Sequence, residues 1–153
     1  MRGVWDGSHL PSMSLTGALP TQLGLLTAMT SLRLGSNSLN GPIPTELGLM
    51  TAMQYLNVVS NSQLGGTIPT ELGLMTAMTY MYLYSSSLIG TIPTELGLMT
   101  MLKELRVETN SLTGTLPTEF GLMTLFEYLS VTGNSLSGTI PTEFGLLTAM
   151  EYL

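Results

Sequence analysis

Side chains that could carry out chemistry are few in this sequence. The only histidine is His9, Asp6 lies three residues before it, and there is no cysteine. A nucleophilic site needs a nucleophile and a base within hydrogen-bond reach, and a thiolate zinc site needs cysteine. No glycine-rich loop followed by lysine is present to hold phosphate. We therefore interpret His9 as a surface residue, expect no bound metal or cofactor, and predict that the protein is not an enzyme.

Tyrosine is the residue type best placed to form a binding surface. Tyr80, Tyr82 and Tyr84 alternate along one segment, which puts them on one face of a strand, roughly 7 Å apart. Aromatic residues and arginine dominate binding hot spots. The candidate binding residues are Tyr55, Asn57, Tyr80, Tyr82, Tyr84, Glu104, Arg106, Glu108, Tyr128 and Tyr152. The simpler alternative is that tyrosine favours strands and its rings pack along them.

A repeated motif must position these residues. It reads Gly-x-Ile-Pro-Thr-Glu-Leu-Gly-Leu-Met-Thr or a close variant, at intervals of 24 or 25 residues. It begins at Gly17, Gly41, Gly66, Gly90, Gly114 and Gly138. Such regularity predicts a solenoid. After each motif, leucines alternate with polar residues as in a half-buried strand, and strands recurring in one direction must form a parallel sheet. The Pro-Thr-Glu segment predicts about one turn of 3₁₀ or irregular helix on the outer side.

One repeat carries a family resemblance. It reads Leu102-x-x-Leu105-x-Val107-x-x-Asn110-x-Leu112-x-Gly114-x-Leu116-Pro117-x-x-Phe120-Gly121. This arrangement resembles the plant-type leucine-rich repeat, and the match extends over residues 17–153. The resemblance implies an α/β fold: a right-handed solenoid with a parallel sheet on the concave face and short 3₁₀ or irregular segments on the convex face. It departs from secreted members in lacking cysteine-paired caps.

The resemblance also implies a function. Members include the ectodomains of receptor-like kinases and receptor-like proteins, and the polygalacturonase-inhibiting proteins. We therefore expect a non-enzymatic scaffold, part of a receptor-like or adaptor protein, that binds a protein, a peptide or a glycan through the concave face. The subclass indicates the cell surface or the extracellular space, whereas residues 1–10 lack the apolar run of a signal peptide. The compartment is left open.

The repeat register predicts the division of the chain and its core. Residues 1–16 are expected to form a degenerate capping turn, with Trp5 over the first coil. Residues 17–153 are expected to form five full repeats and a truncated sixth, which suggests a fragment. Four columns should be buried: Met29, Met53, Met78, Leu102, Phe126 and Met150; Leu32, Leu56, Met81, Leu105, Leu129 and Leu153; Ile43, Ile68, Ile92, Leu116 and Ile140; and Leu47, Leu72, Leu96, Phe120 and Phe144.

Two irregularities interrupt the repeat. Asn37, Asn61, Asn110 and Asn134 share a column in which an amide can bond unpaired backbone groups, and Ser86 is the exception. We predict that Ser86 is a weak link and that asparagine there would raise the melting temperature. Gln63 is an extra residue that should bulge outward without disturbing the core.

Three further columns offer alternative surfaces. Leu25, Leu49, Leu74, Leu98, Leu122 and Leu146 should be partly buried against the outer turn; if they face outward, they form an apolar stripe suited to a structural or oligomerising role. Gln22, Glu46, Glu71, Glu95, Glu119 and Glu143 should form a solvated acidic face rather than a calcium site. Thr67, Thr91, Thr115 and Thr139 could order water, as in an ice- or surface-binding solenoid.

Composition excludes two classes of partner. The chain has ten acidic and four basic residues, a formal net charge of −6, which argues against nucleic acid and an anionic membrane surface. No run approaches the roughly 18 apolar residues that a membrane span needs. Apolar residues make up 44% of the chain, which is ample for a core.

Overall fold

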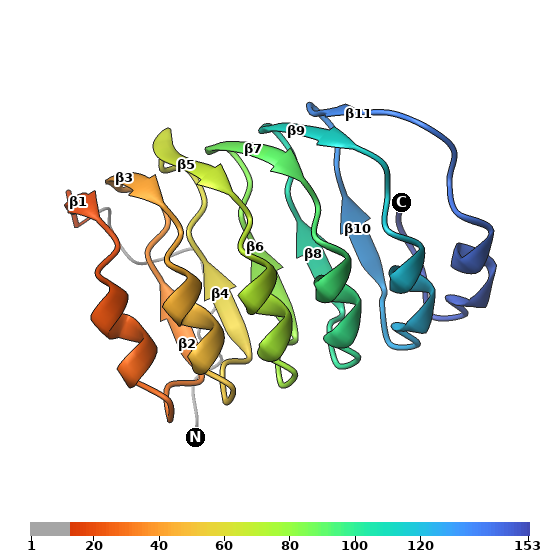
Figure 1. Ribbon diagram of the computed structural model, residues 1–153, viewed down its shortest axis with the longest axis horizontal. Coiled ribbons are helices and arrows are strands. Elements are labelled where there is room, and N and C mark those ends of the chain that lie inside the picture. The colour runs from red at the N-terminus through yellow and green to blue at the C-terminus, as the bar shows by residue number, and fades with distance from the viewer. Residues whose placement is uncertain (1–12) are drawn as a thin grey trace, which may run out of the picture.

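The computed structural model describes residues 13–153, which form one stack of similar coils (Figure 1). The expectations for Trp5, Asp6 and His9 fall outside these residues. Within these residues the coils contribute six short helices and the strands of two parallel sheets, six strands in one and five in the other, so the expected solenoid is confirmed.

The first sheet has five strands in residues 13–153 and carries the tyrosines. Its members are β2 (Ser31–Arg33), β4 (Tyr55–Asn57), β6 (Tyr80–Tyr82), β8 (Glu104–Arg106) and β10 (Tyr128–Ser130). Neighbouring coils pair in register, Tyr55 with Tyr80 and Tyr80 with Glu104. We call the outward side of this sheet the concave face.

A second parallel sheet was not expected from the sequence. Its members are β1 (Thr16–Ala18), β3 (Ser38–Pro42), β5 (Gln63–Thr67), β7 (Ser87–Thr91), β9 (Ser111–Gly114) and β11 (Ser135–Leu136). These segments read as turns because they hold serine, asparagine and glycine, and the glycine is at positive φ, +78° at Gly90. Stacking nevertheless brings the same segment of each coil beside its neighbour, where the backbones pair.

The predicted outer 3₁₀ turns are confirmed. They are η1 (Thr21–Leu25), η2 (Thr45–Leu49), η3 (Thr70–Leu74), η4 (Thr94–Leu98), η5 (Thr118–Leu122) and η6 (Thr142–Leu146), and their outward side is the convex face. Proline occupies each N-cap, and no side chain caps these helices.

The glycine within each helix permits close stacking of coils. A Cβ built on Gly73 would lie 2.4 Å from the carbonyl oxygen of Glu95 in the next coil, closer than any real contact. In the structure, the glycine is needed because the neighbouring backbone passes directly over it.

The four predicted columns fill the space between the sheets and the helices, and most of their members are buried. Two members are exposed, contrary to expectation: Ile140 is 62% exposed and Leu153 is 51% exposed. Both lie in the last coil, where no further coil packs over them.

The asparagine ladder makes the predicted bonds. The amide nitrogen of the buried Asn61 donates to the carbonyl of Val58 in its own coil (2.9 Å) and to that of Leu34 in the preceding coil (3.0 Å). Its Oδ1 accepts from the N–H of Leu39 (3.0 Å). Asn110 and Asn134 repeat this pattern with their own neighbours, so each amide joins two coils.

Ser86 and Gln63, which the sequence presented as separate irregularities, act on the same backbone group. By the repeat pattern, an asparagine at position 86 would accept from the N–H of Leu64. The extra residue instead lets Leu64 donate to the carbonyl of Asn61 at 2.8 Å, within its own coil. Gln63 points outward, and Asn61 and Leu64 stay buried, as predicted. The hydroxyl of Ser86 is buried without a hydrogen-bond partner among the described residues.

Candidate functional site on the concave face

Strand alternation determines which residues reach the concave face. Leu56, Met81 and Leu105 point inward and are fully buried, so the residues on either side of them must point outward. Pairing in register then places the ten candidate residues on one face of successive coils, and Tyr152 joins through a bridge to Tyr128. All six tyrosine rings lie outside the core, and most are half-buried against one another.

Three tyrosines form a cluster over β4 and β6. The ring centroids of Tyr55 and Tyr82 are 5.4 Å apart in an edge-to-face arrangement, and Tyr80 lies 6.1 and 6.4 Å from the two. Such tilted contacts are favourable beyond the area they bury. The guanidinium carbon of Arg33 sits 4.0 Å above the Tyr55 ring. Arg33 was absent from the sequence-based set, although its place in the strand column matches Asn57 and could have revealed it.

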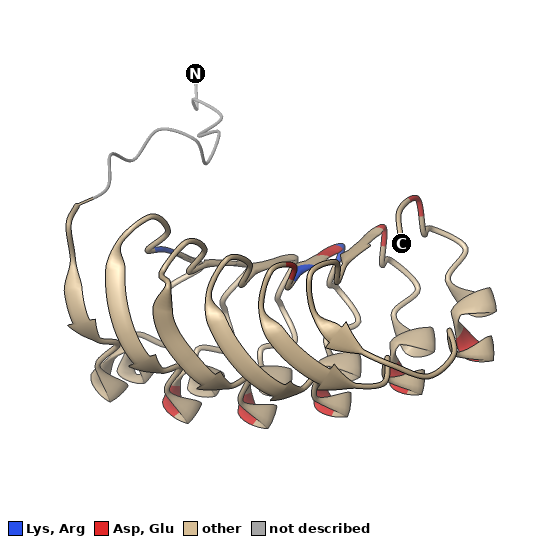
Figure 2. Cartoon of the chain, turned by 90° about the horizontal axis from the view of Figure 1, so that it is seen from above, with Lys and Arg blue, Asp and Glu red and all other residues tan. Residues whose placement is uncertain are grey.

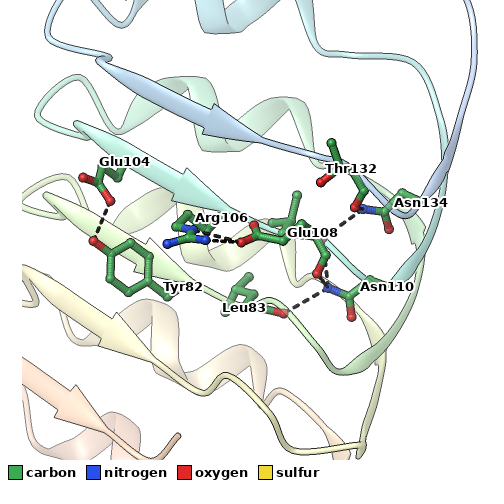
Figure 3. Close-up of polar contacts among 9 residues, drawn as sticks. Tyr82, Leu83, Glu104, Arg106, Glu108, Asn110, Thr132 and Asn134 are labelled. Atoms are coloured by element: carbon green, nitrogen blue, oxygen red, sulfur yellow. Dashed lines mark hydrogen bonds and ion pairs between the residues drawn. The ribbon is translucent and has the colours of Figure 1, made fainter. Parts of the chain in front are cut away.

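Arg106 is the centre of a second cluster. Its guanidinium carbon lies 4.8 Å from the ring centroid of Tyr84, 5.6 Å from Tyr128 and 6.0 Å from Tyr82. The Glu108 carboxylate accepts from Nε of Arg106 at 2.9 Å and from the terminal nitrogen at 2.5 Å (Figure 3). Partial burial is the largest single influence and lowers the pKa of Arg106, but the hydrogen bond to Glu108, the charge of Glu108 and the neighbouring tyrosines together outweigh it, so the net effect is a raised pKa.

Glu104 fixes the orientation of Tyr82. The phenol donates to the Glu104 carboxylate at 2.6 Å, as Figure 3 shows. Burial of the ring, together with this hydrogen bond, raises the pKa of Tyr82. The phenol therefore stays neutral at physiological pH, and the carboxylate is held beside the aromatic cluster.

Tyr128 and Tyr152 at one end of the candidate surface, and Asn57 at the other end, are held in place by different kinds of contact. The rings of Tyr128 and Tyr152 are stacked, with centroids 4.3 Å apart and planes 7° apart. Asn57 donates weakly to the Tyr55 hydroxyl at 3.4 Å and accepts from the N–H of Val59. A second ion pair, Lys103 with Glu127 at 2.7 Å, lies beside the set and was not anticipated.

One acceptor on this face has no partner. Oε2 of Glu108 is buried and lacks a hydrogen-bond donor among the described residues, whereas Oε1 is paired with Arg106. Unpaired buried acceptors are costly, so this oxygen makes an unfavourable contribution to the stability of the folded state.

Charge is distributed unequally between the two faces. Figure 2 shows the basic residues of the described chain on the sheet side only, while acidic residues also follow the row of outer helices. The three described cations are Arg33, Lys103 and Arg106, and all belong to β2, β8 or the residue before β8. Along the outer helices, each of η2 to η6 carries one glutamate.

The convex leucine column is exposed, so the expectation of partial burial is wrong. Leu25, Leu49, Leu74, Leu98, Leu122 and Leu146 are 52–75% exposed. In each helix the residue two positions earlier, a leucine such as Leu47 or in two helices a phenylalanine, packs toward the core, and the tight turn then directs the second leucine away from it. The threonine ladder is also exposed, at the end of the second sheet.

Comparison with known proteins finds leucine-rich repeats throughout. The leucine-rich repeat family model matches residues 101–123 and 126–147. The BIR3–SERK2 complex from Arabidopsis thaliana contains a chain that is 31% identical, with a TM-score of 0.71, and the alignment covers 81% of this chain and 68% of that one. The protein belongs to the leucine-rich repeat family.

Longer plant receptors contain the same arrangement. The structure of the plant peptide hormone receptor RGFR1 in complex with RGF2 has a TM-score of 0.88 at 32% identity, over 90% of this chain. The structure of PEPR1–AtPEP1 has a TM-score of 0.87 at 31% identity, over 90% of this chain. This repeat array spans 22% and 19% of those two chains. A comparison with curated protein sequences finds no match.

Residues 13–153 lack two further features. No helix there has the length and apolarity to cross a membrane. No three histidine, aspartate or glutamate side chains in that range come together as metal ligands.

Proposed function

We propose that this repeat array is a non-enzymatic scaffold that recognises a peptide or an extended segment of a protein on its concave face. The observation that carries the proposal is the set of tyrosine rings over β4, β6 and β10, which Arg106 of β8 joins by lying among three of them. The contacting residues are Tyr55, Asn57, Tyr80, Tyr82, Tyr84, Glu104, Arg106, Glu108, Tyr128 and Tyr152. No step of chemistry is required of them.

The contacts within this surface favour binding over mere packing. Arg106 and Glu108 are paired, and Tyr82 and Glu104 are hydrogen-bonded, so a ligand would meet groups already held in position. Pre-organisation of this kind lowers the entropy cost of binding. Two similar structures, that of the plant peptide hormone receptor RGFR1 and that of the receptor kinase HAESA in complex with the peptide hormone IDA, support a peptide as the ligand class.

The proposal extends to the setting of the chain. Residues 17–153 would be one part of a longer receptor-like repeat array, with residues 1–16 as a capping turn. Since similar structures are ectodomains of plant receptor kinases, we place the array at the cell surface.

The test is selection from a library of random peptides displayed on phage, followed by affinity measurement of the enriched peptides by fluorescence anisotropy. The double variant Tyr82→Ala/Arg106→Ala removes a ring and the cation at the centre of the surface. We expect it to weaken peptide binding by about 100-fold, because hot-spot residues each contribute a factor of about ten or more. The matched control, Leu74→Thr/Leu98→Thr, alters two exposed residues on the convex face and should leave the affinity of the same peptides within about twofold.

Two outcomes would overturn the proposal. One is a set of enriched peptides whose affinity survives the concave double variant. The other is failure to enrich any peptide on the natural chain while a known peptide receptor ectodomain enriches its own peptides under the same conditions. Thermal unfolding of each variant establishes that a lost affinity is not a lost fold.

A further inference from the structure

The convex face carries a surface that the proposed function does not use. Leu49, Leu74, Leu98 and Leu122 are each more than half exposed and follow one another from coil to coil. Two more apolar side chains are exposed three residues after the ends of η4 and η5: Met101, which is 50% exposed, and Leu125, which is 40% exposed. A continuous apolar surface of this kind on a soluble domain indicates an interface.

The charge beside the stripe restricts what can cover it. Glu46, Glu71, Glu95, Glu119 and Glu143 run parallel to the leucines, one from each helix. Among the residues that the structure describes, each of these carboxylates accepts a hydrogen bond only from the threonine before it. Within residues 13–153 no cation lies on this side, as Figure 2 shows. The edge is therefore a row of unneutralised carboxylates.

A second copy of this chain is a poor occupant. Two convex faces would bring two rows of carboxylates into one interface without any cation to meet them, and like-charge juxtaposition opposes association. An anionic lipid surface is opposed by the same charges. A partner must supply both apolar and basic side chains.

The spacing of the coils fits an α-helix. Parallel strands of successive coils are about 4.8 Å apart, the convex side of the arc is somewhat wider, and the pitch of an α-helix is 5.4 Å. A helix lying along the stripe would therefore place about one turn over each coil. Its apolar residues at i, i+3 and i+7 would meet the leucines, and basic residues on one flank would meet the glutamates.

We propose that the convex face is a docking site for a basic amphipathic α-helix of a protein partner, distinct from the concave ligand surface. Leu49, Leu74, Leu98 and Leu122 provide the apolar contact. Glu46, Glu71, Glu95 and Glu119 provide the charge pairing and fix which flank of the helix faces them. Such a partner could be held while the concave face is occupied.

The probe is a synthetic helical peptide of leucine and lysine, of about 18 residues, which would span about 27 Å, or about five coils. A peptide with glutamate in place of each lysine and one with the same composition in scrambled order are the controls. Affinity for the full chain is measured by fluorescence anisotropy. We expect the leucine–lysine peptide to bind at least about tenfold more tightly than either control, because only it matches both the stripe and its charge.

Matched variants locate the site. Leu74→Thr/Leu98→Thr should weaken the leucine–lysine peptide by about tenfold or more, whereas Ile89→Thr/Met13→Thr, at two other exposed apolar positions, should change it by less than twofold. Glu71→Gln/Glu95→Gln should weaken it by about threefold to tenfold, and the loss should shrink as salt is raised. Glu127→Gln/Glu151→Gln removes two carboxylates elsewhere and should have a smaller effect.

Four results would overturn the proposal. The first is equal binding of the lysine and glutamate peptides, and the second is loss of binding of the leucine–lysine peptide in Tyr82→Ala/Arg106→Ala instead of in Leu74→Thr/Leu98→Thr. The third is that light scattering shows the natural chain to be a dimer and Leu74→Thr/Leu98→Thr to be a monomer. The fourth is that the natural chain co-sediments with phosphatidylcholine vesicles and Leu74→Thr/Leu98→Thr does not. The last two would assign the stripe to a second copy or to lipid. None of them bears on peptides selected for the concave face, so the two proposals fail separately.

Discussion

The concave and convex faces are built from the same repeat, yet they differ in how much the sequence changes from coil to coil. At one concave position the residues are Ser31, Tyr55, Tyr80, Glu104 and Tyr128. On the convex face, four of the six helices end in Glu-Leu-Gly-Leu or Gln-Leu-Gly-Leu, and the other two differ only by phenylalanine in the core position. One face varies, and the other is constant.

This difference follows from what holds each face together. Convex helices of neighbouring coils touch through their backbones, as at Gly73 and Glu95, and a backbone contact tolerates few side chains. Concave side chains touch mainly each other, so any set that satisfies its own charges can be accommodated. The concave face therefore presents different side chains from one coil to the next, whereas the convex face presents the same leucine in every coil.

The largest effect we expect is on the constant face. In Gly73→Ala the new methyl would overlap the carbonyl of Glu95, which cannot retreat without separating two coils. We expect the free energy of unfolding to fall by about 1–3 kcal/mol, the usual range for overpacking, despite alanine's better helix propensity. Denaturant unfolding followed by circular dichroism measures it.

The matched variant for that experiment is Gly145→Ala. A Cβ on Gly145 meets nothing within 4 Å, although the residue occupies the same position in η6. Its unfolding should be unchanged or slightly improved, since alanine suits a helix better than glycine. If both variants lose the same stability, close stacking is not the reason for the glycine.

A smaller effect should appear on the variable face at alkaline pH. Tyr82 has a raised pKa, through burial and its bond to Glu104, relative to an unfolded value of 10.0. As pH rises above about 10, the unfolded chain loses the phenol proton while the folded chain keeps it, so stability falls with pH. Below that pH both states are protonated and the group adds no pH dependence.

The test compares unfolding of the natural chain and Tyr82→Phe between about pH 8 and pH 11. The phenylalanine variant should show a shallower decline, because it has no proton to retain. Tyr84→Phe removes another hydroxyl from the same face, one that makes no hydrogen bond among the described residues, and serves as the control. Parallel curves for Tyr82→Phe and the natural chain would show that the Tyr82–Glu104 bond does not govern this response.

Most of the structural features that repeat in every coil could be predicted from the sequence. Period alone gave the stack, the inward leucine columns, the outer 3₁₀ turns and the asparagine ladder, because each depends on a residue repeated at the same place in every coil. The second sheet escaped prediction because its pairing is imposed by stacking and not by strand-forming residues. Burial was predicted wrongly for Ile140 and Leu153, because the prediction assumed that each member of a column is covered by a coil on both sides.

The candidate site was predictable only in part. Alternation was enough to place all ten residues on one face, but it could not reveal that Arg106 would lie among three rings or that Tyr82 would bond Glu104. Such contacts depend on side-chain torsions and on neighbours 22 to 24 residues away. The burial of the convex leucines was predicted wrongly because it depends on how each short helix is rotated about its own axis, and composition does not specify that rotation.

Ser86 interrupts the asparagine column that is otherwise repeated from coil to coil, and its substitution should give the smallest change in stability. Ser86→Asn should gain only the bonds of the amide nitrogen, since the N–H of Leu64 is already paired with Asn61. We expect the free energy of unfolding to rise by about 0.5–1 kcal/mol, or the melting temperature by about 1–4 °C. In a chain that lacks Gln63 the local turn is lost, Leu64 regains an unpaired N–H, and the same substitution should stabilise by about twice as much. Equal gains in the two backgrounds would mean that the insertion does not compensate for the missing asparagine, and that the two irregularities are independent.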